Sequence, residues 1–297
     1  MYDGNVPTVT VAVPTRGDRT SLMRTVQSAV DDARAVSVGS EFLVVWSGRT
    51  EPPSWAAGLP MVVRHAFALM PGVAVARNVA LREARGALVL FTDDDVVCRP
   101  GWIEAAYMAW RGGAHVVGGP IVLKWPKEKP AWATPLAASL WAAFDLGETP
   151  FDLQSHQAFV SANMAMDRDR ALEVGGFNEH LGHGAGTSLM GEETDFCTRA
   201  IEAGLRLRYE PSAVVEHHVQ PAEVSRCRFL SRMYRFGRTM TVVRPPTRAA
   251  CPIMRRLGKA ILLATSAPFN RNPTAKLGDA AFLLGATSIL VSSKRKV

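Results

Sequence analysis

The sequence predicts an α/β fold, a mostly parallel sheet flanked by helices, and two observations predict it. Short, continuously apolar segments alternate with segments of about 12 residues whose apolar positions recur at helical spacing. The apolar segments have no polar face, which is typical of parallel strands buried on both sides. The 297 residues are enough for one large domain, or for a domain with an appendage, and a hydrophobic fraction of 47% excludes a disordered chain.

The first part of the chain supplies most of this pattern. The run at residues 9–13 is apolar up to Pro14, and ALVLF at residues 87–91 is apolar throughout. Strands are expected at residues 9–13, 41–46, 61–65 and 87–91. Helices are expected at residues 20–33, 73–84 and 101–110.

After Gly113 the pattern is less regular. Residues 125–152 hold four prolines and three tryptophans, and residues 177–191 are rich in glycine, so both are expected to be loops, the first with a short helix. Strands are expected at residues 115–124, 157–166, 206–209 and 213–219. Helices are expected at residues 169–174, 192–203 and 222–243.

Positive charge is concentrated near the C-terminus. Of the net charge of +7, residues 244–297 carry +9, from ten Lys or Arg and Asp279, so residues 1–243 carry −2. Two amphipathic helices are expected there, at residues 253–264 and 280–291. They fit peripheral contact with an anionic membrane, and equally a helical subdomain that packs on the core or forms a homodimer. Aromatic residues are too sparse among the basic ones to favour nucleic acid.

The cysteines and the N-terminus point to the cytoplasm, with the inner face of the membrane as an option. The four cysteines form no C-x-x-C pair and no zinc spacing, which argues for a reducing compartment. No basic segment precedes an apolar one at the start, so no signal peptide is expected. The longest apolar stretch, residues 280–291, is shorter than the roughly 20 residues that cross a membrane.

Three consecutive acids, Asp93, Asp94 and Asp95, follow the buried strand at residues 87–91. Continued strand alternation would point Asp93 and Asp95 to one side. Adjacent carboxylates repel one another, and a divalent cation with oxygen ligands is the simplest partner. The location supports a site, because ligands of open α/β sheets bind beyond the carboxyl ends of the strands. An acidic turn without a ligand is the alternative.

A second group of acids, Glu192, Glu193 and Asp195, opens the helix expected at residues 192–203. Glu193 shares a helix face with Phe196 and the apolar residues that follow, whereas the other two acids lie off that face. A carboxylate against apolar surface has a raised pKa, which suits a general base. The alternative is that the helix dipole favours acids in the first turn.

A histidine pair lies in the strand expected at residues 213–219. Alternation places His217 on the face of Val215 and His218 on the other face. A lone inward histidine is more often a core residue. Its place after the two acidic motifs favours a metal ligand, with His217 as the candidate and His218 left open.

In this order, the motifs resemble the inverting nucleotide-sugar glycosyltransferases of family 2. The matching segments are VTVAVPT, ARN before GALVLFTDDD, SANMAMDRD, GGFNEHLG, GEETDF with Arg199, and YEPSAVVEHHV. The resemblance implies a GT-A fold with a C-terminal helical extension. It implies a transferase domain at residues 1–243, with a nucleotide-binding half at 1–112 and an acceptor-binding half at 113–243, and a basic tail at 244–297.

The resemblance also implies roles for individual residues, with Glu193 as the catalytic base. The nucleotide would be lined by Pro14, Thr15, Arg16, Trp46, Arg77, Asp93 and Asp94. Asp95 of the DXD motif would hold Mn²⁺ or Mg²⁺ together with Asp93 and His217. The sugar or the acceptor would be contacted by Asn163, Glu192 and Asp195.

One position departs from the family. The family commonly has an acidic residue at the end of the second strand, in a V-V-D-x-G-S pattern, where this chain has Trp46. An indole can stack on a base but cannot accept its N–H. The substitution weakens the case for uracil specificity. UDP remains the first choice, and dTDP and GDP stay open. Glu193 stands where Asp is usual and is one methylene longer.

The implied function is metal-dependent, inverting transfer of a sugar from a nucleoside-diphosphate sugar to a hydroxyl acceptor, such as a lipid-linked glycan or a natural-product aglycone. The alternatives are an inactive nucleotide-sugar-binding module of the same fold and a sugar-phosphate nucleotidyltransferase. The latter would carry a longer glycine-rich segment with a lysine, where this chain has only Thr15, Arg16 and Gly17. No G-x-G-x-x-G follows the first strand, which disfavours a dinucleotide oxidoreductase.

Overall fold

A computed structural model of the chain describes residues 7–155, 157–184, 189–243, 259–260, 262–264, 266–267 and 272–293. Its main sheet is built from β1 (Val9–Thr15), β2 (Ser40–Ser47), β3 (Val63–Ala68), β4 (Leu88–Phe91), β6 (Val116–Gly118), β8 (Phe151–Asp152), β9 (Met164–Asp167) and β10 (Leu207–Tyr209). The strand order is β3-β2-β1-β4-β9-β6-β10-β8. The first four strands pair in parallel, and β9 runs antiparallel between β4 and β6.

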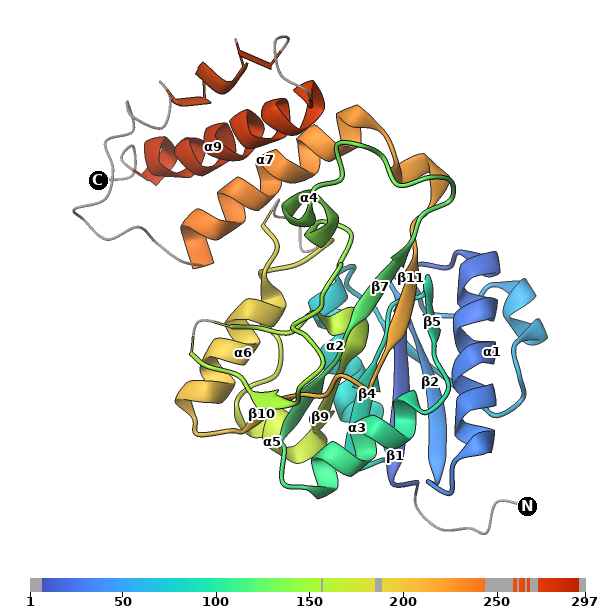
Figure 1. The fold of residues 1–297 in the computed structure, drawn as a ribbon. Helices are drawn as coiled ribbons and strands as arrows, with labels where there is room; N and C mark the ends of the chain where they lie inside the picture. Colours follow the sequence, from blue (N-terminus) through green and yellow to red (C-terminus); the bar gives the residue numbers. More distant parts are fainter. Residues whose placement is uncertain are drawn as a thin grey trace. The chain divides into compact units, whose positions relative to one another are not determined.

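Helices cover both faces of this sheet (Figure 1). On one face α2 (Val73–Glu83), α5 (Arg168–Glu173) and α6 (Glu192–Glu202) share an apolar core with alternate strand residues such as Ala12 and Phe91. The helices α1 (Arg19–Ala35) and α3 (Trp102–Arg111) contact each other as well as the strands. The α/β fold predicted from the alternation of elements is confirmed.

A second sheet fixes the position of the acidic turn. It contains β5 (Val96–Cys98), β11 (Val215–His218) and β7 (Ile121–Lys124), in that order. Asp93, Asp94 and Asp95 connect β4 of the main sheet to β5 of this one. The turn is therefore tied down at both ends, and β11 brings His217 alongside β5 through the register of His217 with Val96.

Two strand expectations are corrected. The strand expected at residues 157–166 is limited to β9, and the 3₁₀ helix η2 (Ser161–Asn163) precedes it. The strand expected at residues 115–124 is divided into β6 and β7. At the division, a Cβ on Gly119 would collide with the backbone carbonyl of Ala213, so only glycine fits this close approach.

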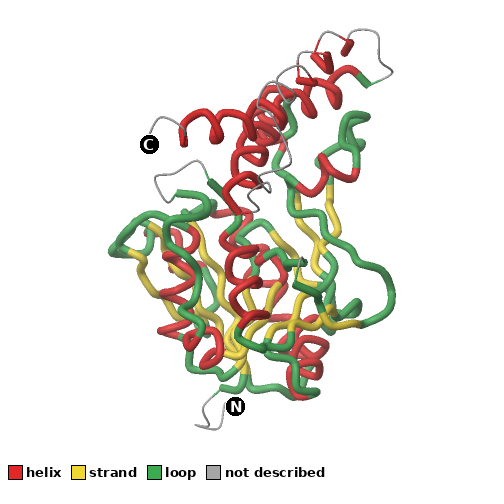
Figure 2. The backbone as a smooth tube through the Cα atoms, turned by 90° about the vertical axis from the view of Figure 1, so that its left-hand side faces the viewer, coloured by secondary structure: helices red, strands yellow, loops and turns green. Residues whose placement is uncertain are grey.

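As far as the structure describes them, the residues form two compact units. The first comprises residues 1–124, 144–186 and 192–218, and the second comprises residues 125–143, 187–191 and 219–297. The expected division at residue 243 differs from this one. The reason is that α7 (Arg226–Val243) lies along α9 (Pro273–Ser293) in both views, so it groups with the C-terminal residues (Figures 1 and 2).

Glycines bring the two long helices of the second unit close together. A Cβ on Gly237 would meet the backbone of Phe282, and one on Gly285 would meet the backbone of Tyr234. The unit also contains α4 (Pro135–Ser139), the short helix expected between residues 125 and 152, and η3 (Pro221–Glu223). The remaining 3₁₀ helix, η1 (Ser54–Gly58), belongs to the first unit.

The helix expected at residues 280–291 falls within α9. Most of the helix expected at residues 253–264 lies outside the described residues. Within the described part of the chain, no helix combines the length and the apolar character needed to cross a membrane.

Candidate active site

The three acids after β4 face three different partners. The Asp93 carboxylate lies 3.3 Å from Nη2 of Arg77, Asp94 accepts a hydrogen bond from the Thr15 hydroxyl, and Asp95 Oδ2 lies 3.1 Å from His217 Nε2. Because β4 ends at Phe91, strand alternation does not extend to the turn. The common orientation of Asp93 and Asp95 stays a prediction. Asp93 lies close enough to Asp95 and His217 for the charges of both to act on its pKa.

Desolvation weakens the acidity of this turn. It raises the pKa of Asp94 to about 7, although the hydrogen bond from Thr15 acts to lower this pKa. It also raises the pKa of Asp93, although the positive charge of Arg77 opposes the shift. A cation near these groups would favour their charged forms and lower both pKa values. The turn is thus prepared for a positive partner.

Arg77 on α2 links the turn to the start of α6. Its side chain is 3% exposed. Nη1 donates a hydrogen bond of 2.9 Å to Oε1 of Glu192 and lies 3.7 Å from Oε1 of Glu193, while Nη2 faces Asp93. The guanidinium carbon lies 5.6 Å from the ring centre of Phe177. One buried cation therefore serves three carboxylates.

The two glutamates of α6 differ in burial, in the order opposite to the one expected. The side chain of Glu192 is 5% exposed and that of Glu193 is 19% exposed. The expectation considered only the faces of the helix. It left out the loop before α6, which covers Glu192 so closely that a Cβ on Gly182 would collide with its carboxyl group. Burial, and then the negative charge of Glu193, raise the pKa of Glu192 to about 7.

Glu193 accepts a hydrogen bond of 2.6 Å from the hydroxyl of Ser161. It is the more exposed carboxylate of the pair, with one donor already in place. Asp195 is held elsewhere, because both its bonds go to Arg199 one turn later. Sequence reasoning missed Ser161. Its position two residues before Asn163, in the same SAN segment, is the signal that could have found it.

Asn163 is buried, and its amide is engaged three times. Oδ1 accepts from Trp102 Nε1 at 2.8 Å, and Nδ2 donates to the carbonyls of Pro120 at 3.0 Å and Ala213 at 2.7 Å. These bonds join α3 and the segments beside the second sheet to η2. In this structure the amide therefore holds the scaffold around Ser161.

Asp95 and His217 are the pair suited to a cation. Their side chains are 26% and 12% exposed, and a carboxylate with an imidazole is a donor set that suits Mn²⁺. Of the two histidines, His217 contacts Asp95 by its ring, whereas His218 contacts it only by its backbone N–H. Among the described residues, no group of three or more His, Cys, Asp or Glu side chains is arranged so that it could hold a metal ion. Further oxygen ligands would have to come from a bound molecule or water.

The end of β1 lies beside this turn. Thr15 accepts a hydrogen bond of 2.8 Å from the N–H of Gly17 while it donates to Asp94. Pro14 is buried in β1, and Arg16 is exposed. Gly184 lies against the Arg16 guanidinium, so the loop before α6 passes close to this arginine.

Trp46 at the end of β2 is not part of this cluster. It is fully buried, its indole N–H donates to Nδ1 of His65 at 3.0 Å, and its ring meets Trp55 edge-on at 5.7 Å. In this structure the indole presents no surface on which a base could stack.

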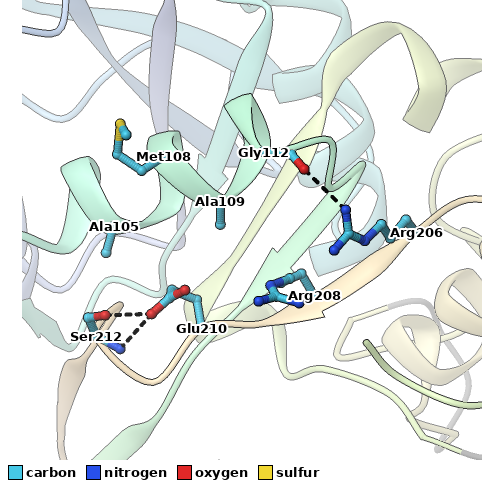
Figure 3. A pocket seen from close by; sticks show the side chains of 8 residues that line it. All are labelled: Ala105, Met108, Ala109, Gly112, Arg206, Arg208, Glu210 and Ser212. Atoms are coloured by element: carbon cyan, nitrogen blue, oxygen red, sulfur yellow. Dashed lines mark hydrogen bonds between the residues drawn. The ribbon is translucent and has the colours of Figure 1, made fainter. Parts of the chain in front are cut away.

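A pocket of about 340 Å³ lies away from these residues, between α3 and β10 (Figure 3). Arg206 donates to the carbonyl of Gly112 at 3.1 Å on its rim, and Glu210 accepts from Ser212 at the other end. None of the acids described above lines it.

Comparison with known proteins identifies the family. The model of "Glycosyl transferase family 2" matches residues 62–175. The Pre-mycofactocin glycosyltransferase of Mycobacterium tuberculosis (strain ATCC 25618 / H37Rv) is 33% identical over 221 residues. This chain belongs to glycosyltransferase family 2. The alignment covers 70% of the chain but only 42% of the relative, so the chain spans less than half of that protein.

Solved structures similar to this family 2 chain confirm the GT-A fold. The mannosyltransferase PcManGT from Pyrobaculum calidifontis, in complex with GDP-Man and Mn²⁺, has a TM-score of 0.58 and 18% identity, covering 98% of this chain and 89% of that one. GalNAc-T7 with UDP, GalNAc and Mn²⁺ has a TM-score of 0.57 and 14% identity, covering 99% and 58%. At these identities the likeness concerns the fold alone.

Proposed function

We propose that this chain transfers a sugar from a nucleoside-diphosphate sugar to a hydroxyl acceptor, with inversion at the anomeric carbon. One observation carries the proposal. Arg77 connects the turn that carries Asp95 with the first turn of α6, so a carboxylate–imidazole pair of the kind that suits a cation and a partly exposed carboxylate belong to one cluster.

On the donor side, Asp95 and His217 would hold Mn²⁺ or Mg²⁺, which when bound neutralises charge on the leaving diphosphate. The Mn²⁺ in the complexes of both structural neighbours supports the use of a divalent metal. Arg16, exposed at the end of β1, is a second positive group for the phosphates. Thr15 and Asp94 hold each other in place at the same strand end.

On the acceptor side, Glu193 would take the proton of the attacking hydroxyl. Its exposed fraction leaves access, and the Ser161 hydroxyl holds one carboxylate oxygen so that the other can face the acceptor. The acceptor oxygen bonds to the anomeric carbon as the bond to the diphosphate oxygen breaks, and the proton ends on Glu193. A single displacement without an enzyme nucleophile inverts the configuration.

UDP is the first choice of nucleotide, with dTDP and GDP as alternatives. Both UDP and GDP-Man occur among the structural neighbours, so the fold accommodates either base. Trp46 brings no carboxylate to the base, and its burial leaves recognition to other residues at the strand ends. A thermal-shift screen of nucleoside diphosphates with Mn²⁺ separates the three.

The test of the function is release of nucleoside diphosphate from a panel of nucleotide sugars in the presence of Mn²⁺. We expect slow release by hydrolysis with the correct donor, and faster release with an acceptor. Glu193→Gln should suppress the acceptor-dependent rate, and Glu202→Gln, an exposed site on the same helix, is the matched control. An inactive binding module would bind a donor and release nothing, which would refute the proposal.

The acceptor class is addressed by the products. The relative named for pre-mycofactocin supports a natural-product aglycone, and a lipid-linked glycan is the alternative. Mass spectrometry of reactions with an aglycone panel and with polyprenyl-phosphate glycans would identify the glycosylated species.

A further inference from the structure

We propose that Arg77 is a positioning residue, which sets the first turn of α6 against the acidic turn after β4, and that the charge of the donor diphosphate is met by Arg16. The inference rests on the proposed function for the reaction that it supports. It differs from the implication that Arg77 itself lines the nucleotide.

The first argument is the set of contacts that Arg77 already makes. Its Nη1 is bonded to Glu192 at 2.9 Å, and its Nη2 lies 3.3 Å from Asp93. A guanidinium is planar and presents donors on two sides, so it can bridge two carboxylates that a lysine ammonium would serve only one at a time. The bridge spans 115 residues of sequence between Arg77 and Glu192.

The second argument is charge. With Asp93, Glu192 and Glu193 around it, Arg77 stands in a cluster where carboxylates outnumber cations. Its Nε has no hydrogen-bond partner but is buried, so a diphosphate would have to displace at least one carboxylate to reach the two Nη donors, at a large cost for a buried group. Arg16 is exposed at the end of β1 and, among the described residues, makes no ion pair with a carboxylate.

The third argument is how firmly Arg77 is held. The next residue of the ARN segment, Asn78, donates to the carbonyl of Phe177 and accepts from its N–H, both at 2.8 Å. Phe177 in turn lies against the guanidinium of Arg77, at 5.6 Å. The segment therefore fixes both the arginine and the ring beside it. Such a rigid arrangement suits a residue that holds the first turn of α6 against the acidic turn after β4 better than a residue that contacts a ligand.

Substitutions of the two arginines should therefore change different kinetic parameters. Arg77→Lys keeps the positive charge but loses one arm of the bridge. Glu193 would then lose its fixed position, and kcat should fall about 10- to 100-fold, the effect of a small misplacement of a reacting group. The donor KM, and the Kd of the nucleoside diphosphate with Mn²⁺, should change less than about twofold.

Arg16→Gln should do the opposite and raise donor KM about tenfold or more, with kcat nearly unchanged. The matched control is Arg82→Lys, exposed on the same helix as Arg77.

A double variant separates positioning from loss of the fold. Arg77→Gln alone leaves the buried Glu192 without its cation, and the melting temperature should fall. Adding Glu192→Gln removes that carboxylate charge, so the pair should recover melting temperature relative to Arg77→Gln alone. If the decrease in melting temperature of the double variant equals the sum of the decreases of the two single variants, the bridge is refuted.

The decisive result is the split between the two arginines. A raised nucleotide Kd in Arg77→Lys with unchanged kcat would make Arg77 a nucleotide ligand and overturn the proposal. Nucleotide binding and melting temperature do not require turnover. They therefore test the bridge even if the wild-type protein releases no nucleoside diphosphate, a result that would refute the proposed function alone.

Discussion

At the scale of single residues, the two adjacent glutamates in the first turn of α6 have different surroundings. Glu192 is buried against Arg77, and Glu193 is partly exposed and bonded to Ser161. A general base must both reach the acceptor and be free to take a proton. Glu193 meets the first requirement better, because Glu192 is covered and committed to an ion pair.

Glu193→Gln should therefore lower kcat by about 10²–10⁴, the range for losing general-base help, with little change in donor KM. Glu192→Gln should cost less, because an amide oxygen can still accept the bond from Arg77. The measurement is kcat for both variants at saturating donor. A dead Glu192→Gln beside a near-normal Glu193→Gln would move the base assignment by one residue.

The raised pKa of Glu192 has a consequence for stability. The pKa of Glu192 is about 7 in the folded protein, against an ordinary value of 4.5 for a glutamate side chain. Between these values the folded state holds more protons than the unfolded state, so the free energy of unfolding falls as the pH rises through this window. In metal-free protein, Tm should drop between pH 5 and pH 7, by roughly 2–6 °C for this one group. Glu192→Gln should show a smaller drop, and equal drops in the two proteins would contradict the prediction. Asp94 contributes with the same sign in both proteins and cancels in the comparison.

The candidate site residues could be predicted from the sequence where they lie in short local motifs that follow one another in a characteristic order. The acids, Arg77 and His217 were found because their motifs are local. The burial order of Glu192 and Glu193 was not, because it depends on a loop and on a helix more than 100 residues away. Ser161 was missed although it lies in the SAN segment, because its bond to Glu193 joins residues 32 positions apart.

At the scale of elements, α3 is capped by another helix. Its own N-cap residue, Gly101, has no side chain that could accept a hydrogen bond. Asp32 of α1 accepts from the N–H of Gly101 at 2.6 Å and from that of Ile103 at 2.8 Å. Asp32 thus satisfies two donors that a helix start leaves open.

Asp32→Ala should lower the free energy of unfolding by about 1–2 kcal/mol, the usual cost of a lost cap. Donor KM should stay the same, since Asp32 makes none of the contacts described for the candidate site. Urea denaturation measures the effect. The control is Asp31→Ala, an exposed neighbour on α1, for which a change within about 0.5 kcal/mol is expected. An Asp32 variant as stable as this control would contradict the cap.

Elements were predictable where one segment decides its own structure. The strands β1, β2 and β4 are mostly apolar, and their positions were found to within a few residues. The expected strand at 157–166 was too long because the amide of Asn163 is bonded to the carbonyls of Pro120 and Ala213. Those contacts hold η2 in a turn, and no pattern within the segment reveals them.

At the scale of the whole molecule, charge is divided along the sequence. Residues 244–297 carry +9 and residues 1–243 carry −2. Membrane contact and packing between copies remain predictions from this division. Deleting the C-terminal residues would remove α9 from α7 and expose the apolar side chains between them, such as Met233. Binding to vesicles would then change for the wrong reason, so charge has to be removed without removing the helix.

Lys294, Arg295 and Lys296 follow α9 directly and can be changed to glutamine together. If this part of the chain meets an anionic membrane, wild-type protein should co-sediment with vesicles that contain phosphatidylserine at low salt, and less so at high salt. The triple variant should bind about 10- to 100-fold more weakly, since each basic residue near such a surface contributes about 1 kcal/mol. Neutral phosphatidylcholine vesicles are the control. Wild-type protein that ignores anionic vesicles at low salt would refute membrane contact. Light scattering on the same samples would then test the homodimer, whose mass should double that of the 32.2 kDa chain.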